Sequence, residues 1–128
     1  MSKKVLSIVE TAYRGTLEEQ DDTILWLNHA LKNNGLDVAV LLRANAVNYA
    51  VRGQDASGLR FGEGALAHPP EIDKDVEALV RKGVKVFLVT EDARERGIPD
   101  EKLLPGVEKL GRAQIPSLFQ RFDQVWHW

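Results

Sequence analysis

The chain has 128 residues, of which 44% are apolar and 28% are charged, and its formal net charge is −2. This length and composition are those of one globular domain with a buried core, so we expect residues 1–128 to form a single domain. The small negative charge provides no basic field for a polyanion, and we therefore expect no nucleic acid partner.

Two absences narrow the classes of function further. No apolar run approaches the roughly 18 residues that a membrane-spanning helix needs, and the first residues do not resemble an export signal. We therefore expect a cytoplasmic protein without membrane contact. The sequence also contains no cysteine, which excludes a disulfide, a thiolate nucleophile, a persulfide and a thiolate-bound metal.

The first part of the chain alternates predicted strands and helices. Residues 3–10 (KKVLSIVE) hold the nearly continuous apolar run of a strand that is buried on both faces of a parallel sheet. Apolar residues at helical spacing ahead of Gly35 predict an amphipathic helix that ends there. Residues 37–43 repeat the buried-strand pattern, and the alanine-rich segment 44–51 predicts a short helix.

A long connection separates these elements from the next strand. Residues 53–70 contain four glycines and a pair of prolines, which predicts an irregular loop that is either functional or packed against another subunit. Residues 71–82 then carry apolar side chains at helical spacing and end at Gly83, and residues 84–89 predict a third strand.

The last part of the chain continues the alternation. Thr90 is predicted to cap a short helix over residues 91–96, and a short fourth strand is expected within residues 103–110. Residues 115–119 begin a helix with proline in its first turn, and residues 124–128 predict a further strand. This alternation indicates a mostly parallel sheet that helices cover on both faces.

Ligands of such sheets bind beyond the carboxyl ends of the strands. Polar side chains follow three of the predicted strands, and they are the candidate ligand-binding residues. Glu10 and Tyr13 follow the first strand, Asn45 follows the second, and Thr90 and Glu91 follow the third; other residues at the same strand ends are Thr11, Arg14, Arg43, Asn48 and Asp92.

The acidic residues near these ends allow two interpretations. Glu10, Glu91 and Asp92 could form a cluster that holds a cation or acts as a general base. Glu91 and Asp92 also follow the predicted cap, where the helix dipole favours negative charge, and this favours capping over catalysis. Glu10 is the stronger candidate because a strand end directs it toward the ligand side.

The histidine and tryptophan side chains give less evidence of a functional site than the polar residues at the strand ends. His29, His68 and His127 are spread over a predicted helix, a loop and the last strand, without the close spacing of metal ligands, so we expect no metal and no cofactor. Trp126 and Trp128 alternate on the last strand and therefore share one face, which indicates either core packing or a subunit contact.

Taken together, these segments resemble the DsrE/DsrF-like family, which includes the sulfur-relay subunits TusD and TusC. The resemblance covers nearly the whole chain and rests on Tyr13 in the first loop and on the segments NAVNYAVRGQ, DKDVEALVRKGVKVFLV, VTEDARERGI and LLPGVEKL. It implies a flavodoxin-like three-layer sandwich with a mostly parallel five-stranded sheet. It also implies a homo-oligomer, a trimer or hexamer, with other subunits of the family as further partners.

The chain departs from the pattern of this family at one position that matters for its chemistry. Active members of the family hold sulfur as a persulfide on a cysteine that ends the third strand, and Val89 occupies that position here. A valine can neither ionise nor form a persulfide. The resemblance therefore implies a non-carrier paralogue, acting in interaction or regulation linked to sulfur metabolism, with contacts through residues 53–70 and the last strand. The alternative is a small-ligand binder or thiol-independent enzyme that uses a crevice lined by Val89 and the candidate residues.

Overall fold

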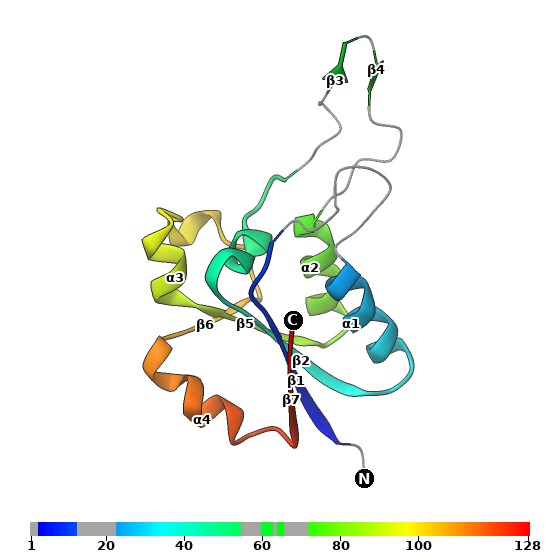
Figure 1. Cartoon of the computed structure of the whole chain (residues 1–128), viewed down its shortest axis with the longest axis vertical. Helices are drawn as coiled ribbons and strands as arrows, with labels where there is room; N and C mark the ends of the chain where they lie inside the picture. Colours follow the sequence, from blue (N-terminus) through cyan, green and yellow to red (C-terminus); the bar gives the residue numbers. More distant parts are fainter. Residues whose placement is uncertain (1–2, 13–22, 55–59, 63, 66–71) are drawn as a thin grey trace.

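The structure is a computed structural model that describes residues 3–12, 23–54, 60–62, 64–65 and 72–128 (Figure 1). Five strands form one sheet, in which every neighbouring pair is parallel. The strands are β1 (Lys4–Val9), β2 (Asp37–Leu42), β5 (Lys85–Val89), β6 (Glu108–Leu110) and β7 (Gln124–His127). They lie in the order β6, β5, β2, β1, β7 across the sheet.

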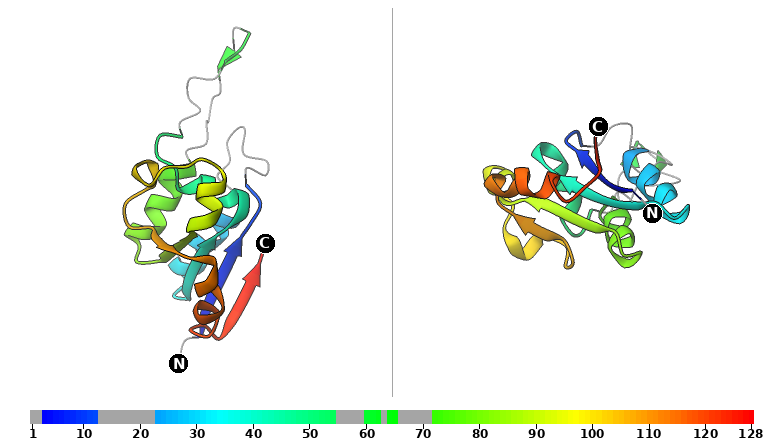
Figure 2. Two further views of the ribbon diagram at one scale, coloured as in Figure 1. Left: turned by 90° about the vertical axis from the view of Figure 1, so that its left-hand side faces the viewer. Right: turned by 90° about the horizontal axis from the view of Figure 1, so that it is seen from below.

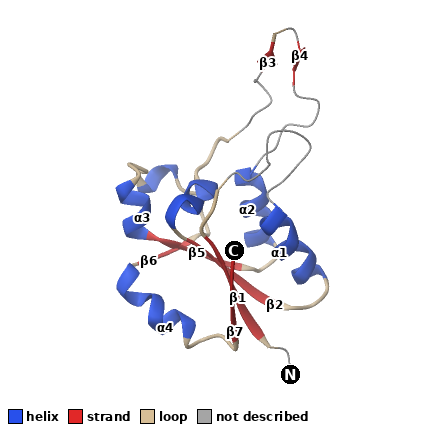
Figure 3. Ribbon diagram, viewed as in Figure 1, coloured by secondary structure: helices blue, strands red, loops and turns tan. Residues whose placement is uncertain are grey.

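Helices cover both faces of this sheet, which gives the predicted α/β fold of flavodoxin-like type (Figures 2 and 3). The α-helices are α1 (Thr23–Asn33), α2 (Ile72–Arg81), α3 (Thr90–Glu95) and α4 (Ile115–Phe119). Three short 3₁₀ helices join them: η1 (Ala44–Ala50), η2 (Asp100–Lys102) and η3 (Arg112–Gln114). The helices α1 and α2 and the segment η1 pack on one face, and α4 packs on the other.

The strand sequences explain this two-sided core. Leu42 belongs to the apolar cluster under α1 and α2, whereas the preceding residue, Leu41, belongs to the cluster under α4. Both side chains are fully buried. Because successive side chains of a strand point to opposite faces, only a strand covered on both sides can bury a continuous apolar run.

Glycine ends both long helices in the same way. Gly35 follows α1 and Gly83 follows α2, each with a φ of 88°. The next N–H, of Leu36 or Val84, then bonds back to a carbonyl five residues earlier, at 3.1 and 3.0 Å. A side chain is strained at such a φ, so glycine is the residue that lets the chain turn back into the following strand.

Two predictions from the sequence differ from the structure. Thr90 does not cap α3, because the helix begins at Thr90 itself and Val89 precedes it without a side-chain capping bond. The connection over residues 53–70 is not wholly irregular, since it contains the short antiparallel pair β3 (Arg60–Phe61) and β4 (Gly64–Ala65). Most of the other residues of that connection lie outside the described residues.

The order of the strands places a topological switch at β1. The chain passes outward from β1 through β2 and β5 to β6, and it then returns to add β7 on the other side of β1. Ligand sites of open parallel sheets lie at the carboxyl ends of the strands that flank such a switch. Among the described helices, none combines the length and apolar character needed to cross a membrane.

Candidate functional site

Three polar side chains meet at the carboxyl ends of β1, β2 and β7. Glu10 follows β1, Arg43 follows β2, and His127 ends β7. Oε1 of Glu10 lies 3.2 Å from Nε of Arg43 and 3.0 Å from Nε2 of His127. One carboxylate oxygen is thus shared by a guanidinium group and an imidazole ring. We call these three residues the Glu10 cluster.

Backbone hydrogen bonds hold the cluster at this edge. The N–H of Arg43 donates to the carbonyl of Val9 at 3.1 Å, and the N–H of Trp128 donates to the carbonyl of Ile8 at 3.0 Å. The parallel pairing of β1 with its two neighbours therefore continues one residue beyond each strand. Because β1 lies between β2 and β7, the Glu10 cluster spans the topological switch.

The cluster is accessible and incompletely satisfied. The side chains of Glu10, Arg43 and His127 are 31%, 39% and 57% exposed. Nε of Arg43 is itself buried, and despite its closeness to Glu10 its N–H has no acceptor in hydrogen-bond geometry. A buried donor without an acceptor costs about 1–3 kcal/mol. The arrangement can bind a ligand with an acceptor group, and a carboxylate beside an imidazole can orient it for proton transfer.

Glu91 and Asp92 bind neighbouring segments of the chain instead. The carboxylate of Glu91 accepts the backbone N–H of Arg112 at 2.9 and 3.0 Å. Asp92 accepts the backbone N–H of Ala44 at 2.7 Å and a guanidinium N–H of Arg112 at 2.5 Å. These contacts tie η1 and η3 to the first turn of α3. Within the described residues, no hydrogen bond or ion pair joins either carboxylate to Glu10.

The same contacts keep both acids ionised. The backbone N–H of Arg112 holds the pKa of Glu91 below its ordinary value. Burial raises the pKa of Asp92, but the N–H of Ala44 and the guanidinium of Arg112 outweigh burial, and the net pKa lies below its ordinary value. Asp92 in turn raises the pKa of Arg112. Carboxylates of this kind do not donate protons near neutral pH.

The remaining candidate residues are dispersed. Oδ1 of Asn45 accepts a hydrogen bond from Nε of Arg96 at 3.0 Å. Val89 is fully buried among the apolar side chains under α4, and Thr90 is partly buried as the first residue of α3. Tyr13 lies outside the described residues.

The sequence alone gives no reason to join Arg43 and His127 to Glu10. Arg43 was visible as a residue after a strand, but His127 is 117 positions away from Glu10 by residue number. Only the strand order, with β7 beside β1, brings them together. Among the described residues, no group of three or more histidine and acidic side chains is placed to hold a metal ion.

Comparison with protein families identifies the chain. The model of the DsrE/DsrF-like family matches residues 3–127, which is nearly the whole length. The chain belongs to the DsrE/DsrF-like family. As a DsrE-like protein it departs from the carrier pattern at Val89, and with no cysteine anywhere in its sequence it has no other thiol to take that place.

Solved structures share this DsrE-like fold. The crystal structure of the ychN protein from E. coli is 27% identical, with a TM-score of 0.70 and coverage of 100% of both chains. A protein of unknown function from Methanobacterium thermoautotrophicum is 18% identical, with a TM-score of 0.61 and coverage of 98% of this chain and 99% of the other, and shows the fold alone. No curated protein matches the sequence.

Proposed function

We propose that this chain is a non-carrier subunit of the DsrE/DsrF-like family, which assembles with itself and acts in the cytoplasm by interaction or regulation linked to sulfur metabolism. The observation that carries the proposal is the buried Val89 at the end of β5, in a chain without cysteine. Persulfide transfer requires a sulfur atom that can be attacked and released, and no side chain here supplies one.

Apolar groups that face solvent support self-assembly. Trp26 on α1 is 60% exposed, and Val125 on the edge strand β7 is 39% exposed. Trp128 is satisfied within the chain, because its Nε1 donates to Oγ of the buried Ser7 at 2.7 Å and its ring packs against the core. Trp126 meets Trp128 edge to face at 6.5 Å. Among the described residues, Val125 and Trp26 are therefore better placed than the paired indoles to contribute to a contact surface.

Native mass spectrometry of the full chain tests the assembly, and we expect a trimer or hexamer at micromolar concentration. Intact-mass measurement after incubation with a persulfide donor tests the lack of carrier activity, and we expect no gain of sulfur. A monomer in the first experiment contradicts self-assembly. A stable gain of one sulfur atom in the second contradicts the non-carrier role. The two outcomes are independent of each other.

A second candidate function is the binding of a small ligand by the Glu10 cluster, with or without catalysis. The position of the cluster at the topological switch favours it. Glu10→Gln removes the charge that Arg43 and His127 share, whereas the control Glu77→Gln removes a partly exposed carboxylate on α2 whose ion-pair partner among the described residues is Arg81. If the chain binds a ligand that stays bound through purification, the mass of that ligand disappears from the native mass spectrum of Glu10→Gln and remains in that of Glu77→Gln. If the chain binds no ligand there, both variants give the same native mass spectrum as the unsubstituted chain.

A further inference from the structure

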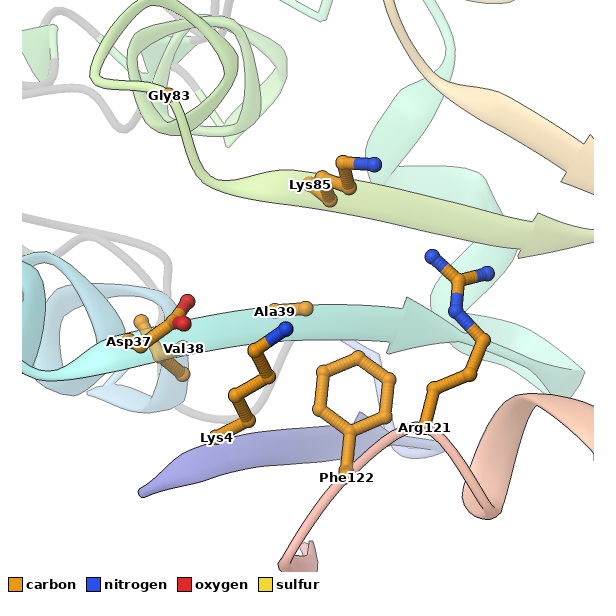
Figure 4. A pocket seen from close by; sticks show the side chains of 8 residues that line it. All are labelled: Lys4, Asp37, Val38, Ala39, Gly83, Lys85, Arg121 and Phe122. Carbon is orange, nitrogen blue, oxygen red and sulfur yellow. The ribbon is translucent and has the colours of Figure 1, made fainter. Parts of the chain in front are cut away.

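A second polar site lies at the opposite end of the sheet. A pocket of about 540 Å³ opens at the amino ends of β1, β2 and β5 (Figure 4). Its lining includes Lys4, Asp37, Ala39, Lys85, Arg121 and Phe122. None of these residues belongs to the Glu10 cluster. The general preference of open parallel sheets for ligands at the carboxyl ends of their strands does not predict a site at this amino end.

Small side chains on the sheet create the hollow. In the strand register, Ala39 of β2 stands between Leu6 of β1 and Lys85 of β5. Two residues further along, Leu41 and Phe87 fill the same face and pack under α4. The helix ends at Phe119, and the methyl group of Ala39 leaves the space beyond it open.

Reciprocal hydrogen bonds fix the walls of the pocket. The N–H of Lys4 donates to Oδ2 of Asp123 at 2.8 Å, and the N–H of Asp123 donates to the carbonyl of Lys4 at 2.8 Å. Asp123 directly follows the wall residues Arg121 and Phe122. The segment after α4 is therefore held against the start of β1, and a ligand would not have to order these walls on binding.

Positive charge converges on this pocket without a direct ion pair between the described residues to neutralise it. Figure 4 shows the Phe122 ring between the side chains of Lys4 and Arg121, with the Arg121 guanidinium directed toward the strand of Lys85. The guanidinium lies 5.7 Å from the centre of the Phe87 ring. Among the described residues, no carboxylate lies within the 4.0 Å ion-pair distance of the three cationic groups.

The local charge is opposite to that of the whole chain. Three cations and the carboxylate of Asp37 leave two positive charges in excess among the lining residues, and the carboxylate of Asp123, which accepts the N–H of Lys4, reduces the local excess to one, in a protein of net charge −2. Like charges that face one space repel each other, and an anion between them removes the repulsion. A phosphate monoester, which carries roughly 1.5–2 negative charges at neutral pH, is attracted by this positive excess.

We propose that this pocket binds a small molecule that carries both a phosphate group and an aromatic ring, as a nucleotide does. Arg121 offers a planar fork of donors to the phosphate, and the two lysines add point charges. The ring of Phe122 offers a face for stacking, and Asp37 can accept a hydrogen bond from a hydroxyl group. The volume lies within the range of about 300–1,000 Å³ of small-molecule sites.

Titration of the full chain by isothermal calorimetry tests the proposal. The probes are adenosine 5′-monophosphate and 1-naphthyl phosphate, and adenosine and inorganic phosphate supply each half alone. We expect at least one of the two esters to bind saturably below about 10 mM and more tightly than either half. Binding of adenosine as tight as that of its phosphate, or no saturation with either ester, overturns the proposal.

Matched charge variants locate the binding. Lys85→Gln is expected to weaken the ester that binds by about tenfold, because it removes one charged contact. Lys102→Gln makes the same change of charge on the exposed residue Lys102 of η2, outside the pocket, and we expect no more than a twofold effect. Arg121→Lys keeps the charge and loses the planar fork, so we expect weakening there too. Equal weakening by Lys85→Gln and Lys102→Gln overturns the assignment to this pocket.

Discussion

At the scale of single residues, Asp92 joins three segments of the chain. It is 7% exposed, and it binds the N–H of Ala44 and the guanidinium of Arg112 from its place in α3. The neighbouring Glu91 binds the backbone of Arg112. These carboxylates look like a candidate acidic site in the sequence. In the structure, hydrogen bonds from other segments of the chain occupy their oxygens. We call these contacts of Asp92 and Glu91 with Ala44 and Arg112 the clamp.

The lowered pKa of Asp92 predicts how stability depends on pH. The folded chain holds this carboxylate ionised more strongly than the unfolded chain, so its contribution is present above the unfolded pKa and is lost as pH falls through the folded pKa, below about pH 4. We expect Asp92→Asn to lower stability at pH 7 and to show a smaller further loss on acidification. Urea unfolding at a series of pH values measures both effects.

The matched control for this prediction is Asp100→Asn. Asp100 is exposed and pairs with Lys109 across the surface, so its replacement changes the net charge equally without touching the clamp. Its curve should follow that of the unsubstituted chain between pH 7 and the acid transition. If Asp92→Asn and Asp100→Asn give the same pH dependence, the clamp does not supply the acid-sensitive stability.

Ala44 provides a second prediction at this scale. It is the one non-glycine among the described residues with a positive φ, at 51°, and Asp92 binds its N–H. An L residue in this backbone region costs roughly 1–2 kcal/mol, and glycine avoids that cost. Glycine in turn loses about 0.5–1 kcal/mol of stability because its unfolded chain has more conformational entropy. We expect Ala44→Gly to be neutral or slightly stabilising. Thermal unfolding of the variant measures this effect. In the same assay, Ala113→Gly, at an exposed position of η3, should cost about 0.5–1 kcal/mol.

At the scale of elements, a glycine governs how the turn before β6 approaches α2. Gly106 has a φ of 88°, and a Cβ atom there would lie 2.7 Å from Cγ1 of Val80 on α2. A Cβ atom on Gly97, which has a φ of 68°, would meet nothing within 4 Å. The two glycines therefore separate the cost of backbone strain from the cost of a clash.

We expect Gly106→Ala to destabilise the chain by about 1–3 kcal/mol more than Gly97→Ala, because overpacking adds to the strain that both share. The measurement is the difference in unfolding free energy from chemical denaturation. Combining Gly106→Ala with Val80→Ala should recover part of the extra loss. Equal costs for the two single variants would mean that the turn shifts freely away from α2.

The elements were largely predictable from sequence because local signals specify them. Continuous apolar runs such as residues 37–43 occur where a strand is covered on both faces, and Gly35 and Gly83 end helices through a φ that other residues avoid. The cap expected at Thr90 failed because the helix begins one residue earlier than the capping pattern requires. Helix starts depend on tertiary contacts, here those of the next two residues, which local propensity does not contain.

The candidate site was less predictable because it depends on strand order. Glu10 could be named from the end of its own strand, but its contact with His127 exists only because β7 adds beside β1 rather than beside β6. The pocket near Lys85 was not predictable either. Its cations come from two strands and from the segment after α4, and its hollow depends on the register of Ala39.

At the scale of the whole molecule, one face of the sheet carries both candidate sites. Alternation along β1 directs Leu6 and Ile8 under α4, and Lys4 shares their side of the strand. The pocket therefore lies at the amino end of this face, α4 covers its middle, and the Glu10 cluster lies at its carboxyl edge. Val89 is buried beneath the same cover, among side chains that include Ile115 and Leu118 of α4.

This burial predicts how a thiol at the carrier position would behave. Val89→Cys places a single cysteine in a chain that has no other, so an aromatic disulfide reagent reports on that site alone. We expect its labelling in the native state to be slower by a hundredfold or more than that of Ser117→Cys, an exposed position on α4, because reaction requires α4 or the whole chain to open. Addition of denaturant should bring the two rates together.

Comparable rates in the native state would show that α4 opens readily. The side chain at position 89 would then be within reach of solvent in the native state. Slow labelling instead means that the side chains packed around this position exclude solvent, so that one substitution does not restore a carrier. In that case the missing cysteine and the cover of α4 both keep persulfide chemistry away from this position, and the two candidate ligand sites among the described residues lie at the ends of the sheet instead.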